Sequence, residues 1–172
     1  MKDIYLKFEG ATELQGDSTD TKHANEIEIS SFQHLLSQPK SSSASSAGGH
    51  TAERTEHGEI IMVKDIDKAT PKLNRASSAG TVYPKVYITF YRAYGGSNAT
   101  STSQTRVDYY KIVLENVVVS SSNTVVADGE LPTQTFGLKY GKITWEYKQH
   151  KMDGSSTSTG VAGWDLRKNV AV

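Results

Sequence analysis

The chain has 172 residues, of which 19 are Lys or Arg and 19 are Asp or Glu, so its formal net charge is zero. This balance provides no basic excess for binding nucleic acid or an anionic membrane, and no acidic excess typical of a disordered tail. The chain has no cysteine, which excludes disulfides, thiolate nucleophiles and cysteine-ligated metals. No apolar run is long enough to span a membrane, and the first residues lack the apolar region of a secretory signal peptide. We therefore expect a single domain over residues 1–172, made in the cytoplasm and not inserted in a membrane.

The pattern of apolar residues predicts a chain of short strands. In chain order, these are residues 4–8, 26–38, 60–65, 85–94, 106–120, 134–147 (two runs) and 163–166. The alternation changes phase at Ser30 and again at Gly141, which indicates a bulge or a sharp bend at each point. One helix is expected over residues 70–79, with Thr70 as its N-cap, Pro71 at its first position and Gly80 after its end. Short antiparallel strands with one flanking helix predict a mainly β fold, either a barrel or a sandwich of two packed sheets.

The stretch 106–120 has the clearest strand signature, because it is rich in β-branched and aromatic residues and has no Gly or Pro. Strict alternation places apolar side chains on both of its faces. An antiparallel strand with one solvated face should instead alternate between apolar and polar residues. We therefore expect both faces of this strand to be covered, one by the core and the other by a helix, a loop or another subunit.

Residues 38–58, called the 38–58 arm below, form the predicted long loop. The arm contains the low-complexity stretch KSSSASSAGGH at residues 40–50. Loops of this length are uncommon inside compact domains and are usually functional or disordered. Two interpretations stay open: a flexible surface loop, or an arm that becomes ordered against a neighbouring subunit.

The sequence contains no motif for catalysis. The five histidines include no HxxxH or HExxH pair, and there is no G-x-S-x-G, G-x-G-x-x-G, P-loop or EF-hand pattern. Trp145 alternates with Ile143 and Tyr147, which favours a place in the core over a sugar-binding surface. These observations predict a protein that is not an enzyme and that uses no cofactor or metal.

Several segments in order carry a family resemblance. They are DIYLKFEG (3–10), His23 with EIEISSF (26–32), GGHTAERTEHGE (48–59), VKDIDKATPKL (63–73), YYKIVLENVVVSS (109–121), TQTFGLKYGKITWEY (133–147) and GWDLRKN (163–169). Together they resemble the Hcp (haemolysin-coregulated protein) family of bacterial type VI secretion systems, nearly from end to end. The 95–105 hairpin is longer than is usual in that family.

The resemblance implies an antiparallel β-barrel with a flanking helix, similar to phage tail-tube proteins. Such subunits form hexameric rings that stack into a tube, which is exported from the cytoplasm without a signal peptide. The implied partners are further copies of the chain, a VgrG-type spike, the contractile sheath and baseplate proteins, and secreted effectors carried in the lumen. Some members carry a toxin domain after the barrel; because this sequence stops at Val172, no such extension is expected.

The resemblance also suggests positions for these contacts. Within the 38–58 arm, the candidates for contacts between stacked rings are Gln38, Pro39, His50, Glu53, Arg54 and Glu56. Gln33, in the strand after the phase change, is the candidate lumen-facing residue, or else an ordinary polar residue on the barrel surface.

Two alternative functions belong to other classes. A secreted carbohydrate-binding or adhesin-like β-sandwich would use an exposed Trp145 or Trp164 as a platform, and would need a signal peptide. A small hydrolase would need a clustered histidine and carboxylate, which the order of residues does not provide.

Overall fold

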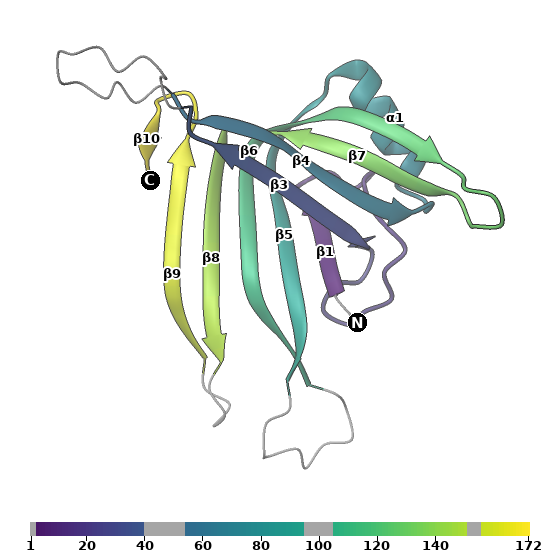
Figure 1. Ribbon diagram of the computed structural model, residues 1–172. Coiled ribbons are helices and arrows are strands. Elements are labelled where there is room, and N and C mark those ends of the chain that lie inside the picture. The colour runs from purple at the N-terminus through teal and green to yellow at the C-terminus, as the bar shows by residue number, and fades with distance from the viewer. Residues whose placement is uncertain (1–2, 40–53, 95–104, 151–155) are drawn as a thin grey trace.

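The computed structural model describes residues 3–39, 54–94, 105–150 and 156–172. In this part of the chain the fold is mainly β with one short helix, as predicted (Figure 1). The elements in order are β1 (Asp3–Phe8), β2 (Ile27–Ile29), β3 (Ser31–Ser37), β4 (Glu56–Asp65), α1 (Thr70–Ala79), β5 (Val82–Tyr94), β6 (Thr105–Val125), β7 (Thr133–Lys139), β8 (Lys142–His150), β9 (Ser156–Asp165) and β10 (Val170–Ala171).

The strands form two layers that share the long strand β6. The larger sheet has the order β10-β9-β8-β6-β5-β1-β2, and β3, β4 and β7 cross in front of it, with β7 paired to the last part of β6 (Figure 1). All the pairings are antiparallel. At the corner between β2 and β3, the Ser30 amide and hydroxyl both donate to the Val63 carbonyl of β4. Within the described residues, β2 and β4 are not otherwise paired as strands, so the sheet is not closed at this corner.

The central strand corrects one expectation. Asn116 has a positive φ of 53°, a conformation that asparagine tolerates better than most residues. The alternation therefore changes phase there: Ile112 and Leu114 are buried before it, and Val117 and Val119 after it. These four residues face one core, whereas strict alternation placed them on opposite faces, so that assignment was wrong. The other face still carries Val113 and Val118, which are half-buried. The phase change also marks the point where one edge of β6 passes from pairing with β8 to pairing with β7.

Several strands are longer than the sequence pattern predicted. β4 begins at Glu56, so Glu56, His57 and Gly58 belong to a strand and not to the loop of the 38–58 arm. β6 continues to Val125, and β9 begins at Ser156, while the short β10 was not predicted. In each case the extra residues are polar, small or exposed, so they carry no apolar alternation that the sequence could show.

The two predicted phase changes are confirmed. The break at Ser30 separates β2 from β3, and the break at Gly141 separates β7 from β8. As a result Ile27 and Ile29 are buried before the first break, and Phe32 packs against the same core after it.

Helix α1 begins and ends almost as predicted. Gly80 follows it with φ 63°, and its amide donates to the Ala76 carbonyl, as expected of a left-handed cap. Thr70, however, is not the N-cap: that position is Ala69, and Asp67 accepts the Ala69 amide through Oδ1 instead. Leu73 and Ala76 face the core. The remaining core residues come mainly from strands of both layers. No helix in the described segments is long and apolar enough to cross a membrane.

Candidate assembly surface

The small sheet β3-β4-β7-β6 presents an outer face whose two central rows are uncharged, beside the Glu59–Lys139 pair of β4 and β7. One row across it runs Gln33–Ile61–Gly137–Ser121, and the next runs Ser31–Val63–Thr135–Asn123. Gln33 is exposed, which fits a lumen-facing residue and an ordinary surface residue equally, and Ile61 is 38% exposed. A Cβ at Gly137 would lie 2.5 Å from Ser121 Oγ and 2.6 Å from Glu59 Oε2, so this position favours glycine. The face can therefore line a channel or contact another chain.

Both edges of this small sheet are unpaired over the described residues. β3 pairs only with β4, and β6 beyond Val118 pairs only with β7. Neither Ser31–Ser37 nor residues 119–125 contain a charged residue, and Leu35 and Val125 are 64% and 43% exposed. Proteins that remain monomeric usually protect such edges with charges, proline or bulges.

The predicted residues of the 38–58 arm lie partly within the described structure. Gln38 and Pro39 follow β3, and the Thr55 hydroxyl donates to Gln38 Oε1, which joins the two ends of the arm. Arg54 and Glu56 are exposed beside them. His50 and Glu53 lie outside the described residues, so the structure brings together Gln38, Pro39, Arg54 and Glu56 at the base of the arm.

Two histidines at this base share one buried phenol. His34 Nε2 lies 2.7 Å from Tyr140 Oη, and His57 Nδ1 lies 3.0 Å from the same oxygen. The register between β3 and β4 shifts after His34, so that Gly58 and Glu59 oppose only Leu35. This bulge turns His57 toward the side that His34 occupies. Burial lowers the pKa of both imidazoles, with His57 adding to the effect on His34, and burial raises the pKa of Tyr140.

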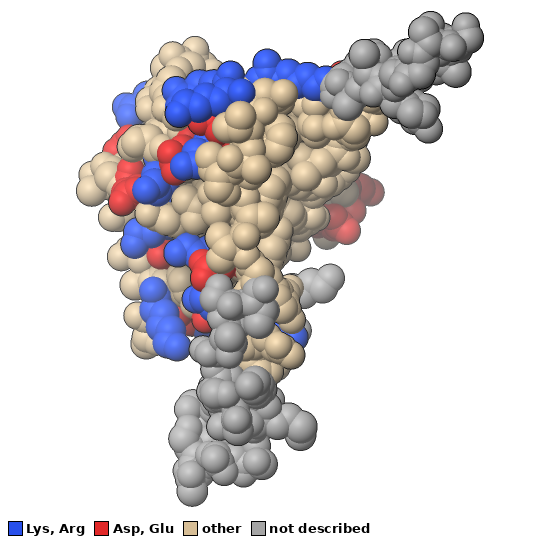
Figure 2. Space-filling model, turned by 90° about the vertical axis from the view of Figure 1, so that its left-hand side faces the viewer, with Lys and Arg blue, Asp and Glu red and all other residues tan. Residues whose placement is uncertain are grey.

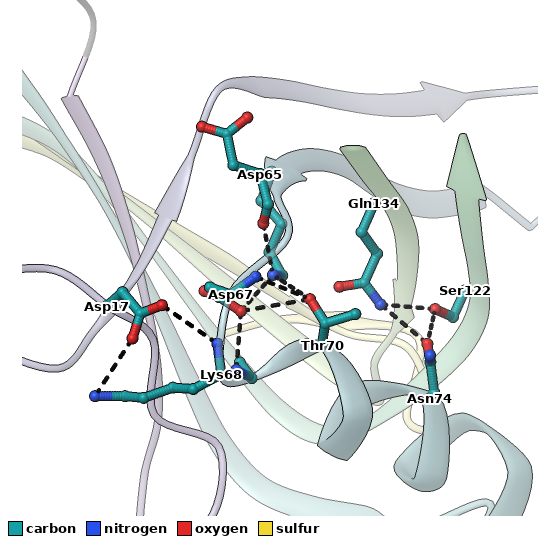
Figure 3. Close-up of polar contacts among 10 residues, drawn as sticks. Asp17, Asp65, Asp67, Lys68, Thr70, Asn74, Ser122 and Gln134 are labelled. Atoms are coloured by element: carbon teal, nitrogen blue, oxygen red, sulfur yellow. Dashed lines mark hydrogen bonds and ion pairs between the residues drawn. The ribbon is translucent and has the colours of Figure 1, made fainter. Parts of the chain in front are cut away.

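A buried lysine joins the end of β4 to helix α1, and Figure 3 labels its partners Asp65, Asp67 and Thr70. Lys64 is fully buried, and its Nζ donates to the Asp65 carbonyl (2.9 Å), Asp67 Oδ1 (2.5 Å) and Thr70 Oγ1 (2.9 Å). Burial lowers the pKa of Lys64, while the bond to Asp67 opposes that shift. Thr70, expected as a cap, therefore serves as an acceptor for this lysine.

A second polar cluster connects α1 to the end of β6 (Figure 3). Asn74 Oδ1 accepts from Ser122 Oγ at 2.6 Å and from Gln134 Nε2 at 3.1 Å, and Gln134 Nε2 also lies 2.8 Å from Ser122 Oγ. Gln134 is fully buried. The helix thus holds the part of β6 whose outer edge is unpaired, and keeps that edge in a fixed position.

At the other end of the molecule, Arg106 holds the first strand and the following loop. Its guanidinium donates to the carboxylates of Asp3 and Asp20, and at 3.0 Å to the Tyr5 hydroxyl. His23 stacks on Tyr5 and bonds to Tyr91 Oη at 2.7 Å. These contacts are internal, so we assign them to stability and not to binding.

Charged pairs lie on both sheets, and on the small sheet Glu59 of β4 pairs with Lys139 of β7. Lys142 pairs with Glu115, and Lys148 pairs with Asp108, on strands of the large sheet. Figure 2 shows basic and acidic side chains intermixed along one side of the molecule, next to a broad uncharged area. Among the described residues, no group of three or more His, Cys, Asp or Glu side chains is placed to hold a metal ion.

The sequence analysis did not predict the His34–Tyr140–His57 cluster or the hydrogen bonds of the buried Lys64 to Asp67 and Thr70. The residues of each come from separate strands or turns, and no spacing rule connects them. Trp145 and Trp164 are both partly buried and packed against the core, so neither provides the exposed platform that the carbohydrate-binding alternative requires.

Comparisons with known proteins agree with this fold. Residues 5–147 match the family model described as "Type VI secretion system effector, Hcp". Protein hcp1 of Pseudomonas aeruginosa is 33% identical over 170 residues, covering 98% of this chain and 97% of the relative. The "Major exported protein" of the same organism is 27% identical over 150 residues, covering 83% and 79% of the two chains.

Among solved structures, one titled "Structure of a type six secretion system protein" superposes with a TM-score of 0.82 at 23% identity, covering 100% of both chains. Hcp1 from Salmonella typhimurium gives a TM-score of 0.70 at 21% identity, with 99% of each chain covered. These likenesses establish the fold, and the family match rests on the sequence. The chain belongs to the Hcp family of secreted type VI secretion system proteins, which are structural and not enzymatic.

Proposed function

We propose that this chain is the ring-forming subunit of a type VI secretion inner tube, a hexamer that stacks and is exported. The observation that carries the proposal is the small sheet β3-β4-β7-β6, whose two opposite edges are uncharged and unpaired within the described residues. When opposite edges of one sheet pair between neighbouring copies, the contact is head-to-tail, and a head-to-tail contact closes into a ring if the rotation permits.

In this arrangement the outer face of the small sheet lines the lumen. Gln33 would then face the lumen from the β3 edge, and Ser121 from the β6 edge of the same row. A lumen whose central rows are uncharged, with Glu59 and Lys139 paired beside them, suits passage of different effectors, because it offers no strong net charge to reject them. The charge pairs of the large sheet would lie on the tube exterior, toward the sheath.

The 38–58 arm is proposed as the contact between stacked rings. Gln38 and Pro39 at one end, and Arg54 and Glu56 at the other, lie together at its base. His50 and Glu53 complete the proposed set on the sequence argument alone. We further infer that the chain meets a VgrG-type spike and baseplate proteins at the tube ends, and is exported from the cytoplasm by the type VI system.

Two edge variants test the proposed ring contact. Leu35→Lys places a charge on the β3 edge and Asn123→Lys places one on the β6 edge, and both positions are exposed, so folding should be preserved. A lysine on an edge strand opposes strand addition. By native mass spectrometry, we expect rings from the unmodified chain and monomers from each variant. The two variants mixed in equal amounts should give heterodimers, because one intact edge remains on each chain.

The matched control is Ala79→Lys, which adds the same charge at an exposed position at the end of α1 and should leave rings intact. Rings formed by either edge variant alone would contradict the proposed contact. The proposed contact would also be contradicted if the mixed variants stay monomeric while the unmodified chain forms rings.

A further inference from the structure

The base of the β3–β4 hairpin contains a group of titratable side chains that ring formation does not explain. His34 on β3 and His57 on β4 both bond to the hydroxyl of Tyr140, which follows β7 and is 8% exposed. The rings of both histidines also contact the Tyr140 ring edge-on, with centroids 5.8 and 5.9 Å apart. Strands β3 and β4 and the residue that follows β7 therefore meet at one phenolic oxygen.

The hydrogen-bond chemistry of this group requires a neutral imidazole. A phenol has one proton to donate, so one histidine must accept that proton while the other donates its own N–H to the phenolic oxygen. When the accepting imidazole becomes protonated it can no longer accept, and the buried Tyr140 hydroxyl loses its acceptor. If both become protonated, two positive charges lie side by side in a partly buried site.

Among the described residues, no carboxylate compensates for such charges. Desolvation lowers the pKa of both imidazoles, and His57 lowers that of His34 further. The nearby charged groups point elsewhere: Glu59 pairs with Lys139 at 3.3 Å, with Lys139 64% exposed, and Glu56 is exposed at the start of β4.

We propose that His34, His57 and Tyr140 form a pH-sensitive clamp, whose protonation loosens the hairpin between β3 and β4 and so weakens both the β3 edge and the base of the 38–58 arm. The effect on assembly rests on the proposed ring function; the loosening of the hairpin does not. The tube would then be stable near neutral pH and would come apart in an acidic environment.

The sign of the pH dependence follows from linkage. Both imidazoles have a lower pKa in the folded chain than in the unfolded chain. The unfolded or opened form therefore binds more protons, and the stability that these groups contribute is present above pH ~6.5. That stability is lost as the pH falls through their folded-state pKa values.

The test is amide hydrogen exchange of segments 31–39 and 54–65 in the assembled protein between pH 8 and pH 5, corrected for the intrinsic exchange rate. We expect opening to increase by more than about twofold in the unmodified chain, because the opened form binds more protons than the closed one. The double variant His34→Gln, His57→Asn keeps an amide near each ring nitrogen that bonds Tyr140 but cannot titrate, so its opening should change by less than about twofold. His150→Gln, a histidine outside the clamp, should behave like the unmodified chain.

An equal pH response in the unmodified chain and the double variant would overturn the clamp. If the double variant does not fold, the single variants His34→Gln and His57→Asn test the clamp instead. Each should reduce the pH response, and an unchanged response in both would refute the proposal. Native mass spectra of the same samples separate the two proposals. Rings without a pH-dependent hairpin contradict the clamp alone, and a pH-dependent hairpin without rings contradicts the tube function alone.

Discussion

Replacing Asp67 with alanine is expected to lower the free energy of unfolding by about 3–5 kcal/mol, the cost of leaving a buried charge without its partner. Lys64 is fully buried, and Asp67 is the only carboxylate bonded to its ammonium among the described residues. The substitution also removes the acceptor for the Ala69 amide at the start of α1. For a chain of this length the loss corresponds to a fall in melting temperature of roughly 6–20 °C.

The neighbouring acid supplies a matched control. Lys64 bonds to the main-chain carbonyl of Asp65, not to its carboxylate, so Asp65→Ala should change the unfolding free energy by only about 0.5 kcal/mol or less. The double variant Lys64→Met, Asp67→Ala removes both charges and should regain much of the lost stability. Thermal melts at one fixed protomer concentration make the comparison, because assembly itself adds stability. Equal melting temperatures for the two single alanine variants would contradict this account.

The second large effect is expected at Leu73, the buried centre of helix α1. Leu73→Ala should cost about 2–5 kcal/mol, from lost apolar burial and the cavity left behind. Leu73 is fully buried between the helix and the core, whereas Lys72 beside it is exposed. Denaturant titration of Leu73→Ala against Lys72→Ala measures the difference. If the two variants unfold at the same denaturant concentration, the helix does not cover the core as described.

The elements that could be predicted from the sequence have local signals. Pro71 and Gly80 mark the ends of the helix, and the phase changes at Ser30 and Gly141 mark real corners of the fold. Each signal depends on a few adjacent residues and on backbone preferences, so it is visible before the tertiary structure is known.

Features that depend on distant contacts could not be predicted. Asn116 lies inside an apolar run, and nothing adjacent to it indicates the left-handed conformation that turns Val117 into the core. Lys64 occupies a core position because Asp67 and Thr70 return toward it, although a lysine in a strand pattern usually indicates a solvated face. The start of β4 at Glu56 is equally hidden, since its first residues are polar.

The features proposed for assembly also divide into those that the sequence can indicate and those that depend on distant contacts. Gln33 is exposed on β3, as both a lumen-facing and an ordinary surface residue would be, so its predicted place in the lumen stays a prediction. The unpaired edges at β3 and at the end of β6 could not be predicted without the strand order, because only the order shows which strands lack a neighbour on one side. The contact of both histidines with Tyr140 depends on the bulge opposite Leu35. That bulge is a feature of strand pairing, so it could not be predicted from the composition.

The most direct test of the central claim is the native mass of the unmodified chain, measured over about a hundredfold range of micromolar concentration, with negative-stain images of the same samples. We predict one dominant species at six times the 18.8 kDa chain mass, seen as annular particles. A monomer at every concentration, with no annular particles, would contradict ring formation through the small sheet.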